Sequence, residues 1–176
     1  MSQVVEFIDT SVLVEVLRIP DKSQCHEAVA QELATRDAAG IRFILPTATI
    51  IETGNHVFQI KAGAARRTCA AKYADLLRMT MRGEAPWTFN RSIWSEDFLG
   101  HLCDGGATGL DLVEHATRSQ LGAGDLSIVV ERDLFAEQVR GSGLTVRIWT
   151  LEACMEAWAE VPAQRSGPDQ SRTALR

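Results

Sequence analysis

The chain alternates between short, nearly continuous apolar runs and longer segments in which apolar residues recur every three or four positions. The runs at 3–8, 41–45 and 144–150 are rich in Val, Ile, Phe and Trp, and their length and composition predict buried strands. The stretch 87–94 fits either a strand or an irregular loop. The longer segments predict helices over 11–19, 21–40, 47–60, 64–82, 95–103, 108–120, 122–140 and 151–161.

Capping residues and breakers suggest where these elements begin and end. Asp21 and Thr47 are candidate N-caps of the segments that follow them, and Pro20, Gly40 and Pro46 end the segments before them. Strands that alternate with helices predict a parallel α/β sheet covered by helices on both faces.

Length and composition predict the number of domains and the cellular compartment. The 176 residues and the apolar fraction of 45% suit one soluble domain, which we expect over 1–162, with a disordered polar tail at 163–176. Neither a membrane span nor a signal peptide is expected, so cytoplasmic localisation is predicted. The four scattered cysteines predict reduced thiols.

The net charge of −5 does not favour nonspecific binding of nucleic acid, which needs a basic surface. It agrees equally with ordinary surface acidity and with carboxylates gathered around a metal ion.

Four acidic residues are predicted to gather at one edge of the sheet. Asp9 follows the first strand and Glu152 follows the last, while Glu52 lies in the second turn of the helix after the second strand. Asp125 opens a helix after two glycines. Ligands bind beyond the carboxyl ends of parallel strands, so we expect the four carboxylates to converge there.

Carboxylates that crowd together raise one another's pKa values, and a divalent cation relieves this repulsion. An all-oxygen set of ligands favours Mg²⁺ or Mn²⁺, which can activate water against a phosphate. Each residue also has a simpler interpretation: Asp9, Asp125 and Glu152 as helix-start residues, and Glu52 as a solvated side chain.

The motifs "FIDTS", "TIIETGNHV", "LGAGDLSIV" and "IWTLE", in that order, resemble those of the PIN-domain family of metal-dependent ribonucleases. The resemblance spans about residues 4–158 and implies a PIN-like sheet. It assigns Asp9, Glu52 and Asp125 to the metal site, with Ser11 and Thr150 as supporting hydroxyls. The family usually has Asp where this chain has Glu152, and Asp133 is a rival for that fourth position.

The resemblance implies endonucleolytic hydrolysis of RNA with Mg²⁺ or Mn²⁺. It also implies a toxin of a bacterial toxin–antitoxin pair of the VapC type, a small antitoxin partner and a homodimer. The densest basic patch, around Arg66 and Arg67, is a candidate for holding the RNA backbone or a solvated helix face.

The sequence leaves two other functions open. One is a catalytically weak PIN-like module that acts through protein partners. The other is a haloacid-dehalogenase-like phosphohydrolase, which requires a second Asp two residues after the first, where this chain has Ser11. Glu6 is unexplained within a buried strand, and we expect it to lie near a sheet end, pair with a cation or face a dimer contact.

Overall fold

The computed structural model describes residues 3–90 and 94–160. Its strands are β1 (Gln3–Ile8), β2 (Arg42–Leu45), β3 (Trp87–Phe89) and β4 (Leu144–Trp149). Its helices are α1 (Thr10–Leu17), α2 (His26–Ala38), α3 (Thr47–Phe58), α4 (Gly63–Arg82), α5 (Glu96–Asp104), the 3₁₀ turn η1 (Gly106–Thr108), α6 (Leu112–Arg118), α7 (Ala123–Gln138) and α8 (Ala153–Glu156).

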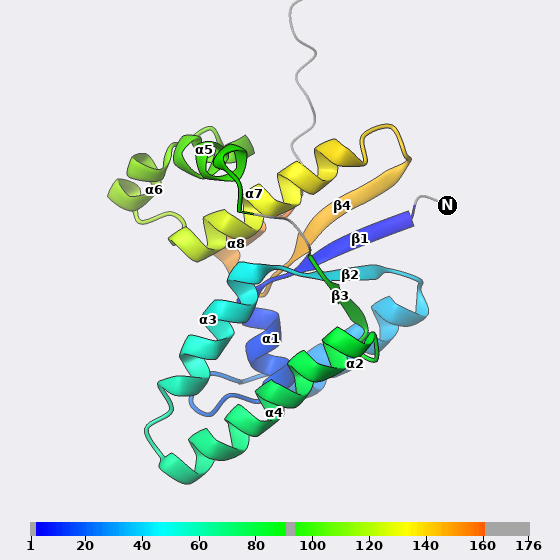
Figure 1. The fold of residues 1–176 in the computed structure, drawn as a ribbon, viewed down its shortest axis with the longest axis vertical. Coiled ribbons are helices and arrows are strands. Elements are labelled where there is room, and N and C mark those ends of the chain that lie inside the picture. The colour runs from blue at the N-terminus through cyan, green and yellow to red at the C-terminus, as the bar shows by residue number, and fades with distance from the viewer. Residues whose placement is uncertain (1–2, 91–93, 161–176) are drawn as a thin grey trace, which may run out of the picture.

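The four strands form one parallel sheet in the order β3-β2-β1-β4 (Figure 1). Strand β1 lies inside this sheet and pairs with β2 on one side and β4 on the other. The carboxyl ends of β1 and β4 therefore lie side by side, where Ile8 pairs with Trp149. The predicted α/β class and parallel sheet are confirmed.

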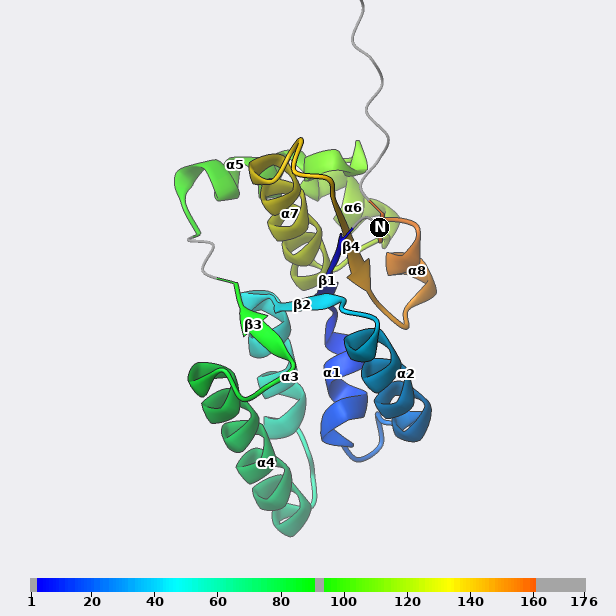
Figure 2. The same cartoon turned by 90° about the vertical axis from the view of Figure 1, so that its right-hand side faces the viewer.

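Helices cover both faces of the sheet (Figure 2). Helices α1 to α4 lie on one face, over a core that includes Ile8, Phe43 and Leu45. Helices α5 to α8 lie on the other face, over a core that includes Val5 and Phe7. Alternate residues of β1 thus enter different cores, as the two-residue period of a strand requires.

Three predicted helices are shorter than the sequence pattern suggests. The one expected over 108–120 is the α-helix Leu112–Arg118, and Thr108 belongs to the separate turn η1. Helix α2 begins at His26 rather than near Asp21, because the Glu15 carboxylate accepts hydrogen bonds from the Ser23 hydroxyl and the Gln24 and Cys25 N–H groups and holds that segment in a turn. The segment predicted as a helix over 151–161 is helical only at Ala153–Glu156. After α8 the chain turns back onto β4, where Ala159 O accepts from Ile148 N.

Other boundaries differ by a few residues. Pro46, not Thr47, is the N-cap of α3, and the stretch 87–94 holds the short strand β3, with 91–93 outside the described residues. The expected tail at 163–176 lies outside them too. Within the described ranges, no helix combines the length and the apolar character that a membrane crossing requires.

Glu6 pairs with cations, one of the three outcomes expected for it. Its side chain is fully buried, and Oε1 lies 2.6 Å from both Arg36 of α2 and Arg147 of β4. The Arg36 guanidinium also lies 4.5 Å from the centre of the Trp149 ring. Glu6 therefore joins the sheet to α2.

Candidate acidic site

Asp9 lies at the carboxyl end of β1 and is 1% exposed. Its Oδ2 accepts hydrogen bonds from the Ser11 hydroxyl at 2.5 Å, the Thr150 hydroxyl at 2.9 Å and the Ser11 N–H at 3.2 Å. The last bond makes Asp9 the N-cap of α1, so the simpler interpretation of this residue also holds. Its other oxygen, Oδ1, is buried and has no hydrogen-bond partner.

Glu52 comes from the second turn of α3, and the start of that helix is joined to β1. The Thr49 hydroxyl donates to Ile8 O at 2.7 Å, one residue before Asp9. The Glu52 carboxylate accepts from the Thr10 hydroxyl at 2.8 Å and lies directly against Gly124 of α7. A Cβ at Gly124 would stand only 1.8 Å from Glu52 Oε1, so any side chain at this position would occupy the space of the carboxylate.

Asp125 is half-buried in the first turn of α7, where its Oδ2 accepts from the Gly122 N–H at 3.1 Å. The pKa of Asp125 is raised from 3.8 to about 6, with burial as the largest cause. The negative charges of Asp9, Glu52 and Glu152 contribute to this rise, and the Gly122 hydrogen bond opposes it. The charges of the three other acids named by the sequence therefore reach Asp125.

Glu152 and Asp133, the two candidates for the fourth acid, lie in different places. Glu152 is the exposed N-cap residue of α8, and its charge acts on Asp125. Asp133 lies eight residues beyond Asp125 on α7, which is about 12 Å along a helix. Its carboxylate accepts from the Ala107 N–H and the Arg132 side chain. The structure thus brings Glu152 to the group and leaves Asp133 outside it.

No basic side chain in the described part of the chain forms an ion pair with Asp9, Glu52, Asp125 or Glu152. Within the same residues, no three His, Cys, Asp or Glu side chains meet as a group that could hold a metal ion as they stand. Two of the acids already accept hydrogen bonds within the chain: Glu52 from the Thr10 hydroxyl and Asp125 from the Gly122 N–H. Bringing three oxygens onto one ion would need those side chains to rotate.

The donor types nevertheless fit a hard divalent cation. All four groups offer carboxylate oxygens, and Asp9 presents a buried oxygen with no hydrogen-bond donor. Oxygen ligands with a net negative charge are those that Mg²⁺ and Mn²⁺ favour. Asp9, Glu52 and Asp125 are the residues that could hold such an ion, with Glu152 beside them.

The candidate RNA-binding residues Arg66 and Arg67 lie elsewhere. They are exposed in the first turns of α4, which begins beyond the far end of α3 (Figure 1). Arg66 donates to Ile60 O at 3.2 Å. The structure does not bring this pair to the acids.

Three neighbours of the acids were not predicted from the sequence. Thr10 begins α1, and its hydroxyl donates to Glu52. Thr49 and Gly124 contact the site across long stretches of chain. The paired glycines of "GAGD" were the one available hint of a close approach at Gly124.

Comparison with family models, with curated proteins and with solved structures finds no match for this chain.

Proposed function

We propose that this chain is a Mg²⁺- or Mn²⁺-dependent endoribonuclease of the PIN type. One observation carries the proposal: Asp9, Glu52 and Glu152 all act on Asp125 by charge repulsion, and no cation of the described chain is paired with any of them. Such a group is costly by itself and is relieved by a bound divalent ion.

Each side chain has a role that its contacts support. Asp9 would hold the ion through Oδ1, while Ser11 and Thr150 keep its Oδ2 fixed. Glu52 and Asp125 would add oxygens from α3 and α7 once they leave their present hydrogen bonds. When bound, the ion would lower the pKa of water and neutralise charge on a phosphate oxygen.

RNA as the substrate comes from the resemblance of the four motifs to the PIN family. The same resemblance supports a toxin role, a small antitoxin partner and a homodimer. All of these are parts of the proposal.

A second candidate is a catalytically weak PIN-like module that acts through protein partners. The internal hydrogen bonds of Glu52 and Asp125 favour it, because in their present positions these side chains do not form a metal-binding group with a third residue. The two candidates differ in whether a divalent cation binds.

The test is cleavage of labelled RNA by the purified chain with Mn²⁺, with Mn²⁺ plus EDTA, and by the variants Asp9→Asn and Asp125→Asn. The proposal expects cleavage that EDTA abolishes and that each variant lowers by at least about 100-fold, which corresponds to about 2.7 kcal/mol of barrier. Asp75→Asn, the same change at an exposed acid of α4, should cleave normally. Equal cleavage by all variants, or cleavage in EDTA, would overturn the proposal.

Absence of cleavage has its own meaning when metal binding is measured on the same samples. If Mn²⁺ also leaves the melting temperature unchanged, the result supports the interaction module. For the toxin role, induced expression in a bacterial host should arrest growth, and Asp9→Asn should relieve the arrest.

A further inference from the structure

The N-terminus of α3 lacks a cap from its own sequence. Pro46 stands at the N-cap and has no side chain that can accept a hydrogen bond, and no acidic residue lies in the first turn. The first N–H groups of a helix have no partner inside the helix, and they carry a partial positive charge. A buried helix start of this kind needs an acceptor from elsewhere in the fold.

Glu131 of α7 lies beside this helix start, because Asn90, which donates to Glu131, also donates its N–H to Leu45 O, just before Pro46. Its side chain is fully buried, and its Oε2 accepts from Asn90 Nδ2 at 2.7 Å. Burial raises the pKa of Glu131, and hydrogen bonding from Asn90, Trp94 and the Thr47 and Ala48 N–H groups opposes this rise. Oε1 is buried and has no hydrogen bond of normal geometry, and a carboxylate in this place is attracted by the partial positive charge of the α3 start.

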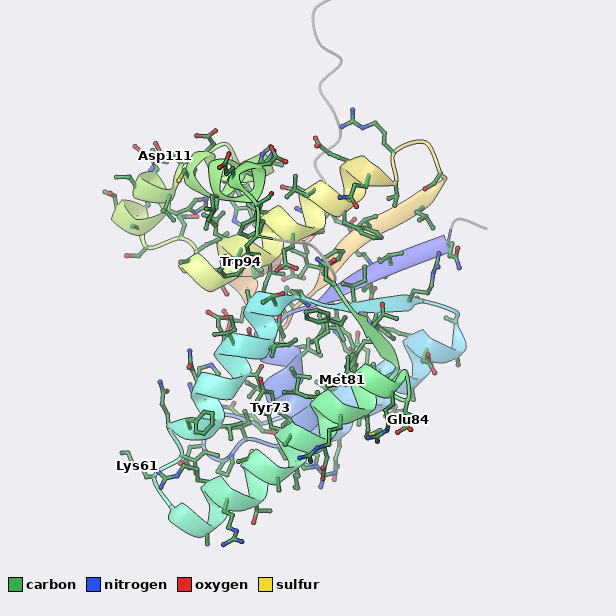
Figure 3. All side chains as sticks on the ribbon, in the orientation of Figure 1. Lys61, Tyr73, Met81, Glu84, Trp94 and Asp111 are labelled. Atoms are coloured by element: carbon green, nitrogen blue, oxygen red, sulfur yellow. The ribbon has the colours of Figure 1, made fainter. Side chains whose placement is uncertain are left out.

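The surroundings of Glu131 come from three separate parts of the chain. Asn90 follows β3, and Thr47 and Ala48 begin α3. Trp94, labelled in Figure 3, contacts Glu131 of α7, and its ring stacks on Phe98 with centres 5.3 Å apart. Glu131 therefore joins α7, α3 and the carboxyl end of the edge strand.

This junction lies close to the acids on both helices. Glu131 comes six residues after Asp125 on α7, and Thr47 comes five residues before Glu52 on α3, which is about 9 Å and about 7.5 Å along the two helices. At the other end of the same helix pair, Glu52 rests against Gly124. The two helices that carry Glu52 and Asp125 are thus in contact at two places, and both acids lie at the second of them.

We propose that Glu131 is a positioning residue of the acidic site, which caps α3 from α7 and so fixes Glu52 opposite Asp125. The inference rests on the proposed function for its consequence, metal binding, but the cap itself is a property of the fold. Outer residues that orient metal ligands typically account for 10- to 100-fold in metal affinity.

The test compares Glu131→Gln with Glu15→Gln. Glu15 is a matched control, because it is also a buried carboxylate that accepts backbone N–H groups at the start of a helix, here α2. Helix α2 carries none of the four acids. Two quantities are measured: hydrogen exchange of the first-turn amides of α2 and α3, and Mn²⁺ affinity from the rise in melting temperature.

Glu131→Gln is expected to speed exchange of the Thr47 and Ala48 amides by about 10-fold and to weaken Mn²⁺ binding by about 10-fold or more. Glu15→Gln should speed exchange near α2 and leave Mn²⁺ affinity unchanged. If Glu131→Gln does not fold, Glu131→Asp, which keeps the charge and shortens its reach, replaces it with the same expectations.

Unchanged exchange in α3 overturns the cap. Faster exchange with unchanged Mn²⁺ affinity, or an equal loss of affinity in Glu15→Gln, overturns the positioning role. If the unaltered chain itself binds no Mn²⁺, the proposed function fails, and Glu131 is then judged by exchange alone as the cap of α3.

Discussion

Glu6 and Asp9 stand three residues apart on one strand and its end, and both are almost completely buried. Glu6 has two arginines within 2.6 Å. Asp9 has only hydroxyl and N–H donors, and its charged neighbours are other acids. The fold thus compensates one buried carboxylate with its own cations and leaves the other without them.

The two buried carboxylates differ in whether their negative charge is balanced by a cation of the chain. Each residue has one buried oxygen without a hydrogen bond, Glu6 Oε2 and Asp9 Oδ1, so an unpaired oxygen alone does not distinguish the two places. A buried charge normally needs a partner. For Glu6 that partner is supplied by two arginines of the chain, whereas the acids around Asp125 have no paired cation within the described residues, and the proposed function supplies one as a divalent metal ion.

The largest effect on stability is expected at the compensated carboxylate. Glu6→Gln leaves two arginines without their shared acid and should lower the free energy of unfolding by about 3 kcal/mol. This value is at the low end for a broken buried ion pair, because both guanidinium groups reach solvent. Asp9→Asn should change it by less than about 1 kcal/mol. Urea unfolding in EDTA measures both, and a larger loss for Asp9→Asn would reverse the comparison.

The next effect is a gain in stability at the crowded acid. The pKa of Asp125 is raised from 3.8 to about 6, so the folded state bears a penalty that is absent below pH 3.8, grows as the pH rises and is complete above about pH 6. Asp125→Asn removes this penalty. It should stabilise the metal-free protein at pH 8 by about 1–2 kcal/mol, less than the full shift implies because water screens a half-buried group.

Urea unfolding at pH 8 and pH 4 checks the sign. The gain should vanish at pH 4, and Mn²⁺ at pH 8 should stabilise the unaltered chain but not the variant. A variant that is less stable at pH 8 in EDTA would show that repulsion at Asp125 has been overstated.

A smaller loss is expected from the hydroxyl that holds Asp9. Thr150→Val removes one hydrogen bond to Oδ2 and should cost about 1 kcal/mol, together with about 10-fold in Mn²⁺ affinity. Thr88→Val is the control, because that exposed hydroxyl lies 3.4 Å from its acceptor, Phe43 O. Equal effects of the two changes on Mn²⁺ affinity would count against a role for Thr150 in the site.

The smallest change in stability is expected at Gly124. In Gly124→Ala the new methyl displaces the Glu52 carboxylate, and the better helix propensity of Ala offsets the lost Thr10 contact, so stability should change by less than about 0.5 kcal/mol. Mn²⁺ affinity should nevertheless fall. Gly100→Ala in α5, where a Cβ meets open space, should stabilise by about 0.5–1 kcal/mol and leave Mn²⁺ affinity unchanged.

Much of the site could be predicted because strand ends in a parallel sheet share an edge. The pattern of apolar runs located β1 and β4 and placed Asp9 and Thr150 at the same edge of the sheet, and the structure shows a hydrogen bond between them. The two glycines before Asp125 correctly predicted that this residue lies at the start of a helix. The roles of these residues in metal binding and cleavage stay predictions.

The features that escaped prediction all depend on contacts between distant residues. Asp21 had the composition of an N-cap, but Glu15 captures the following backbone and delays α2. In the sequence, Glu131 is an ordinary polar residue of a predicted helix. Its neighbours Thr47 and Asn90 are far away in the chain and reach it only in the folded structure. Local propensity cannot report such contacts.

The most direct test of the central claim is calorimetric titration of the unaltered chain and Asp9→Asn with Mn²⁺ at pH 7.5, with Asp75→Asn as the control. The account predicts saturable binding to the unaltered chain and to Asp75→Asn, and its loss in Asp9→Asn although that variant stays folded. Binding that is absent from the unaltered chain, or equally strong in Asp9→Asn, would contradict the claim that these acids form a site for a divalent cation.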